Sequence, residues 1–522
     1  LEGVGGELRS SGSIEAYSST AGQSASVLIE AAYAKVDGMI RSGNGDGNGG
    51  AIRISGSDIS EVGGTLDAIG TDGIGGDIAV EGEEISVGST ARIDASGATG
   101  GGKVRIGGGY QGNDSTLLNA TNNRVESGSR IAADALETGD AGTVIVWSDM
   151  DTMFQGEISA QARGESGNGG FVEVSGKNRL EFAGDVSTAA KNGRTGTLLL
   201  DPADIEITSG AATVPTASTL SAAAITGALG ANNVVISTND GVETDAGDIF
   251  INEAISFNSG NNLSFLATRH IRANAEVQNE GAGDVTLVAG WDEVTGIAGS
   301  TAAGNPNNDD ADFSAIIAGG GGTAFGVGGG SVFIGDGTQA AGIAVGSRYG
   351  NLNVAGDAVT VTGSSTANDG FAMLGYNTAH FVQDAGETVG GTTSMISVQL
   401  AGGDILLNGG SRTGAYAQVG HGGKDGSGIL EADFDVDLGG GDIIVSGGTG
   451  TDAYAHIGHG GRNHIETDNA FIKVGDFDVR GLSDLTLRGG DGTRAYSQLG
   501  HGGHTGRDGK NGNFTLVGDG TG

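Results

Sequence analysis

The chain has 522 residues, of which 105 are glycine, 3 are proline and none is cysteine, and its formal net charge is −38 at pH 7. That charge repels nucleic acid and anionic lipid, so neither is expected as a ligand. Glycine without a three-residue period excludes collagen, and the absence of an apolar run of about 18 residues excludes a transmembrane helix. A long chain without cysteine fits passage through an oxidising compartment.

A glycine pair followed by a short apolar strand recurs through the first part of the chain, mostly at steps of 26 residues. Aliphatic residues lie two and four positions after the second glycine, as at Ile52 and Ile54. This is the spacing of a strand with one buried face. The second glycines of these pairs are Gly50, Gly76, Gly102, Gly142, Gly170 and Gly196.

Two further apolar positions follow each of these strands, so one repeat holds three short strands. The second position is expected at Ile59, Ile85, Leu180 and Ile205, and the third at Leu66, Ile93, Ile158 and Val186. Three strands per repeat fit one coil of a parallel β-helix, with glycine at the corners supplying backbone angles that other residues resist. The sequence therefore predicts an all-β β-solenoid, in which roughly 20 coils at about 4.8 Å give a rod on the order of 100 Å long.

Polar and small residues divide this rod into segments. We expect residues 1–207 to form coils of about 26 residues, with a polar loop inserted near 108–128. Residues 208–232 are rich in Ala, Thr and Ser and form a connector, within which a short helix with Ser218 or Thr219 as its N-cap is expected.

The solenoid is expected to continue beyond the connector. Strand patterns resume over 233–330, with a second polar insertion near 303–313. Residues 331–522 contain the sequence Ala-Tyr-x-x-apolar-Gly-His-Gly-Gly three times, at 415–423, 453–461 and 495–503. We call each copy a cassette. Its histidine is His421, His459 or His501, and its tyrosine is Tyr416, Tyr454 or Tyr496.

The cassette histidines allow more than one interpretation. Looser copies of the cassette place Tyr376 and Ser347 at the histidine position, which favours a histidine ladder at a corner, bonded to backbone or to its neighbour. Two imidazoles sharing a Zn²⁺ ion stay an alternative. The tyrosines predict a stacked aromatic ladder, half-buried, with the hydroxyls reaching outward.

Signatures of catalysis are missing from the sequence. It contains no Gly-x-Ser-x-Gly elbow, phosphate loop or zinc helix. Asp149 and Asp151 are expected at an exposed strand edge or turn. Asp46 and Asp425 lie in Asp-Gly runs similar to calcium-binding turns, but the full nonapeptide is not repeated in tandem. We therefore expect no enzyme and no cofactor, with Ca²⁺ bound at such turns as an alternative.

Residues 108–207 resemble the large exoproteins related to filamentous haemagglutinin. The most specific pieces are GTVIVWSD (142–149), GNGGFVEVSGK (167–177) and GTLLLDPADIEI (196–207), and the cassettes are similar to C-terminal repeats of some of these proteins. The resemblance implies a right-handed β-helix that is secreted by the two-partner route. It also implies export through an outer-membrane β-barrel transporter to the bacterial cell surface. No catalytic residues are shared by such proteins, so none transfer.

The expected function is that of a rod-like surface or secreted protein acting in adhesion, aggregation, biofilm or extracellular filament formation. Its partners would be a host-cell or environmental glycan or surface, or other copies of the chain joined end to end, without membrane insertion. The sequence begins and stops within repeat-like text, so we expect a piece of a longer rod or end-to-end stacking. A glycan-processing enzyme on the same scaffold and a cation-dependent module binding Ca²⁺ or Zn²⁺ stay open as alternatives.

Overall fold

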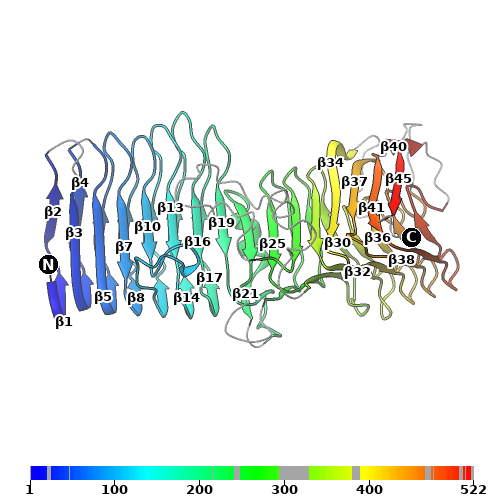
Figure 1. Cartoon of the computed structure of the whole chain (residues 1–522), viewed down its shortest axis with the longest axis horizontal. Coiled ribbons are helices and arrows are strands. Elements are labelled where there is room, and N and C mark those ends of the chain that lie inside the picture. Colours follow the sequence, from blue (N-terminus) through cyan, green and yellow to red (C-terminus); the bar gives the residue numbers. More distant parts are fainter. Residues whose placement is uncertain are drawn as a thin grey trace.

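The computed structural model is an elongated stack of β-strands that runs from one end of the chain to the other (Figure 1). It describes residues 2–19, 25–45, 47–214, 217–239, 247–292, 329–378, 388–464, 472–473, 475–504, 510–511 and 513–518. Within these residues the strands of the long sheets pair in parallel, an arrangement consistent with a β-solenoid. The predicted all-β class with stacked parallel strands is therefore confirmed.

Sheet I runs the whole length of the stack. Its described strands are β1 (Glu2–Ser10), β3 (Ser26–Val36), β5 (Ala51–Val62), β7 (Asp77–Glu81), β8 (Glu84–Val87), β10 (Lys103–Ile106), β11 (Asn122–Val125), β13 (Thr143–Val146), β14 (Asp151–Phe154), β16 (Phe171–Val174), β17 (Arg179–Phe182), β19 (Thr197–Leu200), β22 (Asn233–Ser237), β25 (Leu263–Ala267), β28 (Val285–Ala289), β31 (Leu352–Gly356), β34 (Thr388–Leu400), β37 (Ile429–Asp437), β41 (Phe477–Leu482) and β45 (Phe514–Gly518).

Three shorter sheets complete the coils. Sheet II, in the first part of the chain, contains β2 (Ser13–Tyr17), β4 (Met39–Gly43), β6 (Thr65–Asp67), β9 (Arg92–Asp94), β12 (Arg130–Ala132), β15 (Glu157–Ser159) and β18 (Asp185–Ser187). Sheet III contains β20 (Ile205–Ile207), β21 (Ser218–Leu220), β23 (Ile249–Ile251), β26 (Ile271–Ala273), β29 (Ser331–Ile334), β32 (Ala358–Thr362), β35 (Ile405–Asn408), β38 (Ile443–Ser446) and β42 (Leu485–Arg488). Sheet IV contains β24 (Ile255–Phe257), β27 (Val277–Asn279), β30 (Ile343–Ser347), β33 (Ala372–Leu374), β36 (Ala417–Val419), β39 (Ala455–Ile457) and β43 (Ser497–Leu499). A small pair is formed by β40 (Ile472–Lys473) and β44 (Lys510–Asn511).

A short helix separates sheet II from sheet IV. Helix α1 (Ala222–Ala228) contacts both β18 and β24, so it fills the place of a strand in one coil. Its N-cap is Ser221, whose hydroxyl accepts a hydrogen bond from the Ala224 N–H. The predicted caps, Ser218 and Thr219, are wrong because both residues belong to β21, which pairs with β20. No helix in the described part of the chain is long and apolar enough to cross a membrane.

The core is a set of aliphatic rows that run along the stack. The positions two and four residues after the frame glycines are buried in every repeat, as predicted. The prediction for Ile59 is wrong, since its side chain is 37% exposed and it pairs with Glu84. The inward places of this strand are taken by Ser60, which pairs with Ile85, and by Val62, which pairs with Val87, and all four side chains are buried.

The six frame glycines form a ladder of their own. The Asp77 N–H donates to the Gly50 carbonyl (3.0 Å), and the same bond recurs from Lys103 to Gly76 (2.9 Å). A Cβ added to each later glycine would overlap the carbonyl oxygen of the frame glycine in the previous coil. None of the six has a positive φ, although other glycines between the strands do, such as Gly107 (83°) and Gly139 (83°). The predicted need for unusual backbone angles therefore holds for those glycines and not for the six of the frame. They are needed for close approach between coils.

The polar insertion is shorter than predicted. Strand β11 lies inside the expected loop 108–128 and pairs with β8 and β14. The remaining insert contains a 3₁₀ turn, η1 (Tyr110–Gly112), and runs to Thr121. We call residues 108–121 the strap. The second predicted insertion, 303–313, lies outside the described residues.

Candidate functional site

The cassette histidines lie one above another in successive coils. The rings of His421 and His459 are parallel with centroids 5.0 Å apart, and those of His459 and His501 are 5.1 Å apart. In the two preceding coils the same register places Tyr376 and Ser347 at this position. The sequence alignment of the looser copies therefore corresponds to their positions in the stack.

Hydrogen bonds fix the protonation of these rings. The backbone N–H groups of Tyr376, His421 and His459 donate to the Nδ1 atoms of the histidine in the next coil, over 2.9 to 3.1 Å. Because Nδ1 accepts, the ring proton lies on Nε2. That atom of His459 donates to the Ala432 carbonyl (2.9 Å). Burial lowers the pKa of His421 to about 4 and that of His459 well below its usual value, so both rings are neutral at neutral pH.

The predicted metal ligands are arranged poorly for a cation. Each cassette Nδ1 lone pair already accepts a backbone N–H. The Asp425 carboxylate lies beside Arg462 (3.4 Å) and Lys424 (3.8 Å), which repel a cation. Among the described residues no group of three or more His, Asp or Glu side chains has a metal-binding arrangement. Asp46 lies outside the described residues.

The tyrosine ladder is buried more deeply than predicted. Phe371, Tyr416, Tyr454 and Tyr496 stack with centroids 4.7 to 5.0 Å apart and nearly parallel planes. Tyr416 and Tyr454 are fully buried, so the expectation of half-buried rings with outward hydroxyls is wrong for these two. The Tyr454 hydroxyl donates to Gln418 Oε1 (3.3 Å), which is itself buried. The cassettes are thus turn structures whose rings fill a corner of the solenoid.

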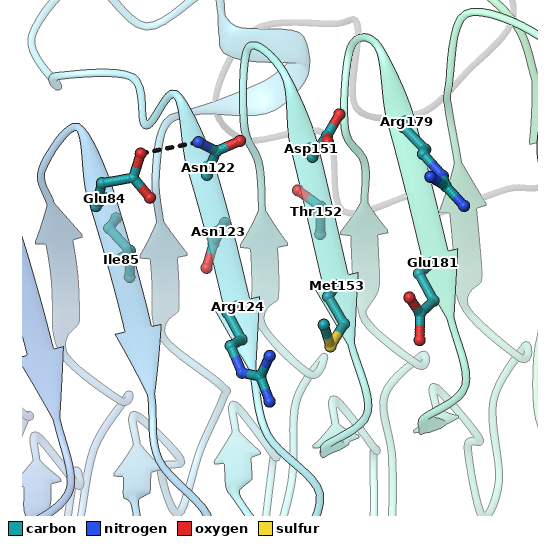
Figure 2. Close-up of a pocket in the computed structure, with 10 residues that line it drawn as sticks. All are labelled: Glu84, Ile85, Asn122, Asn123, Arg124, Asp151, Thr152, Met153, Arg179 and Glu181. Atoms are coloured by element: carbon teal, nitrogen blue, oxygen red, sulfur yellow. Dashed lines mark hydrogen bonds between the residues drawn. The ribbon is translucent and has the colours of Figure 1, made fainter. Parts of the chain in front are cut away.

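A polar depression lies on the outward face of sheet I, over β8, β11, β14 and β17 (Figure 2). In each of these strands the residues that alternate with the core positions point to solvent. The register aligns them in rows across the coils. We call this surface the outward polar face, and it is defined by Glu84, Asn122, Arg124, Asp151, Arg179 and Glu181.

Donors and acceptors alternate on the outward polar face. The Asn122 amide donates to Glu84 Oε1 (2.8 Å), as Figure 2 shows. Asp151 accepts from Asn178 (3.1 Å), and Glu181 accepts from Gln155 (3.3 Å). The prediction of an exposed Asp151 agrees with this position at the start of β14, but the face as a whole was missed. The outward positions of alternating strands are the signal that would have found it.

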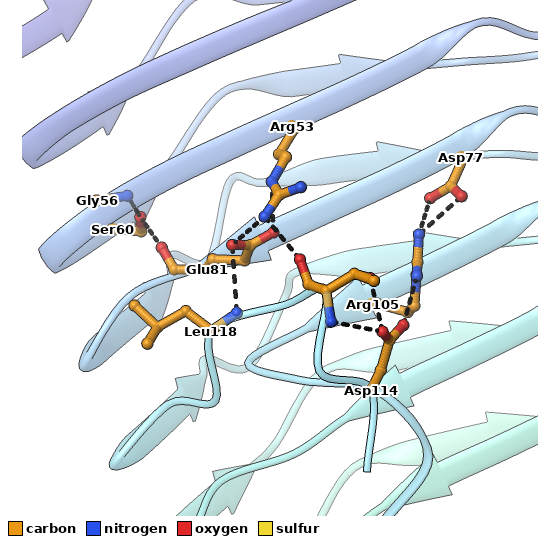
Figure 3. A network of polar contacts seen from close by, with 9 residues as sticks. Arg53, Gly56, Ser60, Asp77, Glu81, Arg105, Asp114 and Leu118 are labelled. Atoms are coloured by element: carbon orange, nitrogen blue, oxygen red, sulfur yellow. Dashed lines mark hydrogen bonds and ion pairs between the residues drawn. The ribbon is translucent and has the colours of Figure 1, made fainter. Parts of the chain in front are cut away.

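The strap is clamped onto the neighbouring part of sheet I (Figure 3). Arg53 forms an ion pair with Glu81 (2.7 Å) and donates to the Thr116 carbonyl (2.9 Å). Arg105 binds Asp77 in the sheet (2.7 Å) and Asp114 in the strap (3.1 Å). Arg53 in β5 and Arg105 in β10 lie two coils apart, on either side of Ala79 in β7, and together they hold the strap in place.

A buried carboxyl group lies under the strap. Glu173 is fully buried in β16, and both of its oxygens accept from the Gln111 N–H at 3.2 Å. Burial, with a smaller contribution from Asp201, raises the pKa of Glu173 to about 8. The carboxyl group is therefore largely protonated at neutral pH. The sequence pattern gave no signal for this contact, because Gln111 and Glu173 are 62 residues apart.

Comparison with known protein families gives no match, and comparison with curated proteins gives none either.

Proposed function

We propose that this chain is a secreted or cell-surface structural protein, a right-handed parallel β-helix that mediates adhesion, aggregation or extracellular filament formation. The observation that carries the proposal is one hydrophobic cluster of stacked rows that extends from Val27 to Leu482. A core of this kind stabilises a long rod through contacts between neighbouring coils. It leaves the outward side chains of every coil free to contact a surface.

Charge and chemistry agree with this role. A net charge of −38 keeps an extended rod soluble and prevents non-specific association. The cassette rings serve packing and backbone hydrogen bonds, which is a structural use of residues that an enzyme would place in a cleft. In this proposal the chain is not an enzyme and needs no cofactor. The resemblance to two-partner exoproteins adds export to the bacterial surface through an outer-membrane β-barrel transporter.

Electron microscopy and an adhesion assay test the proposal together. Negative-stain images of the purified chain should show rods, and a cryo-EM map should show layers at about 4.8 Å with right-handed coils. Beads coated with the protein should aggregate or bind cells, whereas beads coated with an unrelated acidic protein of similar charge should not. Compact globules, or rods whose beads behave like the control beads, would contradict the proposal.

A further inference from the structure

We propose that the outward polar face binds a neutral polysaccharide that lies along the axis of the solenoid. The inference names the partner for the adhesive role above and rests on that proposed function. The face spans four neighbouring strands, β8, β11, β14 and β17, whose side chains repeat at the strand spacing of about 4.8 Å. An extended ligand can therefore contact equivalent positions in consecutive coils.

The arrangement of charges on the face argues against charged ligands. One row runs Glu84, Asn122, Asp151 and Arg179, and the parallel row contains Arg124 and Glu181. The carboxylates repel a polyanion, while the two guanidinium groups repel a cation and prevent the carboxylates from converging on one ion. An uncharged ligand meets neither penalty.

Peptide strands and apolar partners fit the face poorly as well. Strands β8, β11 and β14 are each hydrogen-bonded to a strand on both sides. Strand β17 pairs with β14 on one side and contacts β21 on the other, where the Leu180 N–H donates to the Ser218 hydroxyl (2.9 Å), so the face offers no continuous open edge to an added strand. Two apolar side chains line the depression: Met153, between Arg124 and Glu181 in the second row, and Ile85, which is almost fully buried. This is too little apolar surface to bury a hydrophobic partner.

A polyhydroxylated chain matches what the face offers. Sugar hydroxyls both donate and accept, so they can bond carboxylates, amides and guanidinium groups in turn. Arg179 forms no ion pair with a described side chain and lies beside Asp151 in the next strand, so its donors face the ligand side of the sheet (Figure 2). Hydrogen bonds to charged groups are the stronger kind, which makes Arg179 and Asp151 the main contributors to affinity.

Affinity electrophoresis in gels that contain polysaccharide tests the proposal with the full chain. The probes are neutral dextran, mannan, hydroxyethyl cellulose and laminarin, and acidic alginate and polygalacturonate. We expect retardation by at least one neutral polysaccharide, and a loss of affinity of about tenfold or more in the double variant Asn122→Ala, Arg179→Ala. The matched control is Arg130→Ala with Glu157→Ala, an exposed ion pair (3.2 Å) on the outward side of sheet II, which should bind like the wild type.

Each result decides the matter. No retardation by any neutral probe, retardation by the acidic probes alone, or equal retardation of the two double variants would overturn the assignment. Equal melting temperatures and rods in electron micrographs show that the variants fold. If rods still aggregate cells while no neutral probe binds, the face is wrong and the adhesive function stands. If the rods do not aggregate cells and no neutral probe binds, both proposals fail.

Discussion

Replacing Glu173 by glutamine should make the strap region insensitive to alkaline pH. The glutamine carbonyl can accept the Gln111 N–H as the carboxyl does, but it cannot ionise. In the wild type, ionisation of Glu173 would leave a charge in a fully buried place close to Asp201. The substitution therefore removes the cost of that charge while it preserves the hydrogen bond that anchors the strap.

The size of the effect follows from proton linkage. The folded carboxyl has a pKa of about 8 instead of its usual 4.5, so between these values the folded state holds a proton that the unfolded state has released. Stability is therefore full below pH 4.5, falls as pH rises, and reaches its lowest level above about pH 8. An interval of about 3.5 pH units at about 1.4 kcal/mol per unit sets an upper bound of about 5 kcal/mol for the loss.

Tryptophan fluorescence gives a local readout of this loss. The Trp147 ring lies against Gly108 and Gly112 of the strap, and Trp291 is the other tryptophan of the chain. The free energy of unfolding is measured by urea titration at a series of pH values in a Trp291→Phe background. As pH rises from 5 to 9, this free energy should fall for the protein with wild-type Glu173 but not for Glu173→Gln.

The control makes the same substitution at the surface. Glu157 is exposed on β15, so Glu157→Gln changes the side chain in the same way without involving a buried carboxyl, and it should follow the wild-type curve. If the curves for Glu173 and Glu173→Gln run parallel from pH 5 to pH 9, burial of this carboxyl does not control the strap and the reasoning is refuted.

Two further predictions concern the stack itself. Gly142→Ala should destabilise the fold by about 1–3 kcal/mol and lower the thermal midpoint, because the new Cβ overlaps the Gly102 carbonyl oxygen. The control is Gly227→Ala in α1, where nothing lies within 4 Å of the new Cβ, and it should not lower the midpoint. Equal melting of the two variants would refute the glycine ladder. His421→Asn should keep an acceptor for the Tyr376 N–H without titrating. The wild type, whose His421 pKa of about 4 lies below the usual 6.5, should lose up to about 3 kcal/mol more than this variant as pH falls from 6.5 to 4, measured by urea unfolding with circular dichroism; equal losses would contradict this.

The general architecture was predictable because its signal is local and repeated. The pair Ile52 and Ile54 is enough to indicate a strand with one buried face, and its recurrence every 26 residues indicates stacking. Errors arose where the register with a neighbouring coil decides which residues of a strand face the core. Ile59 is apolar and correctly spaced, yet the register pairs it with Glu84 and gives the inward place beside Ile85 to Ser60.

The candidate sites were less accessible to sequence reasoning for the same reason. The outward polar face exists because coils of different length bring Glu84, Asn122, Asp151 and Arg179 into one row. Their separations in sequence are unequal, since the strap is inserted before Asn122. A repeat of fixed length cannot reveal such a row. The cassette histidines, by contrast, were recognised because identical residues return in a nearly constant frame.

The ladders show which groups a parallel stack tolerates in register. Identical residues can stack at about 5 Å when they are neutral, as His421 and His459 do, whereas the charged neighbours Asp151 and Arg179 in the outward row have opposite signs. The buried groups therefore stabilise the stack only while they remain uncharged. This sets a lower pH limit for one part of the stack and an upper pH limit for another. Acid charges the histidines of the later coils, and alkali charges Glu173 under the strap. Because coils contact only their neighbours, the two regions should fail separately, the later coils first in acid and the strap region first in alkali.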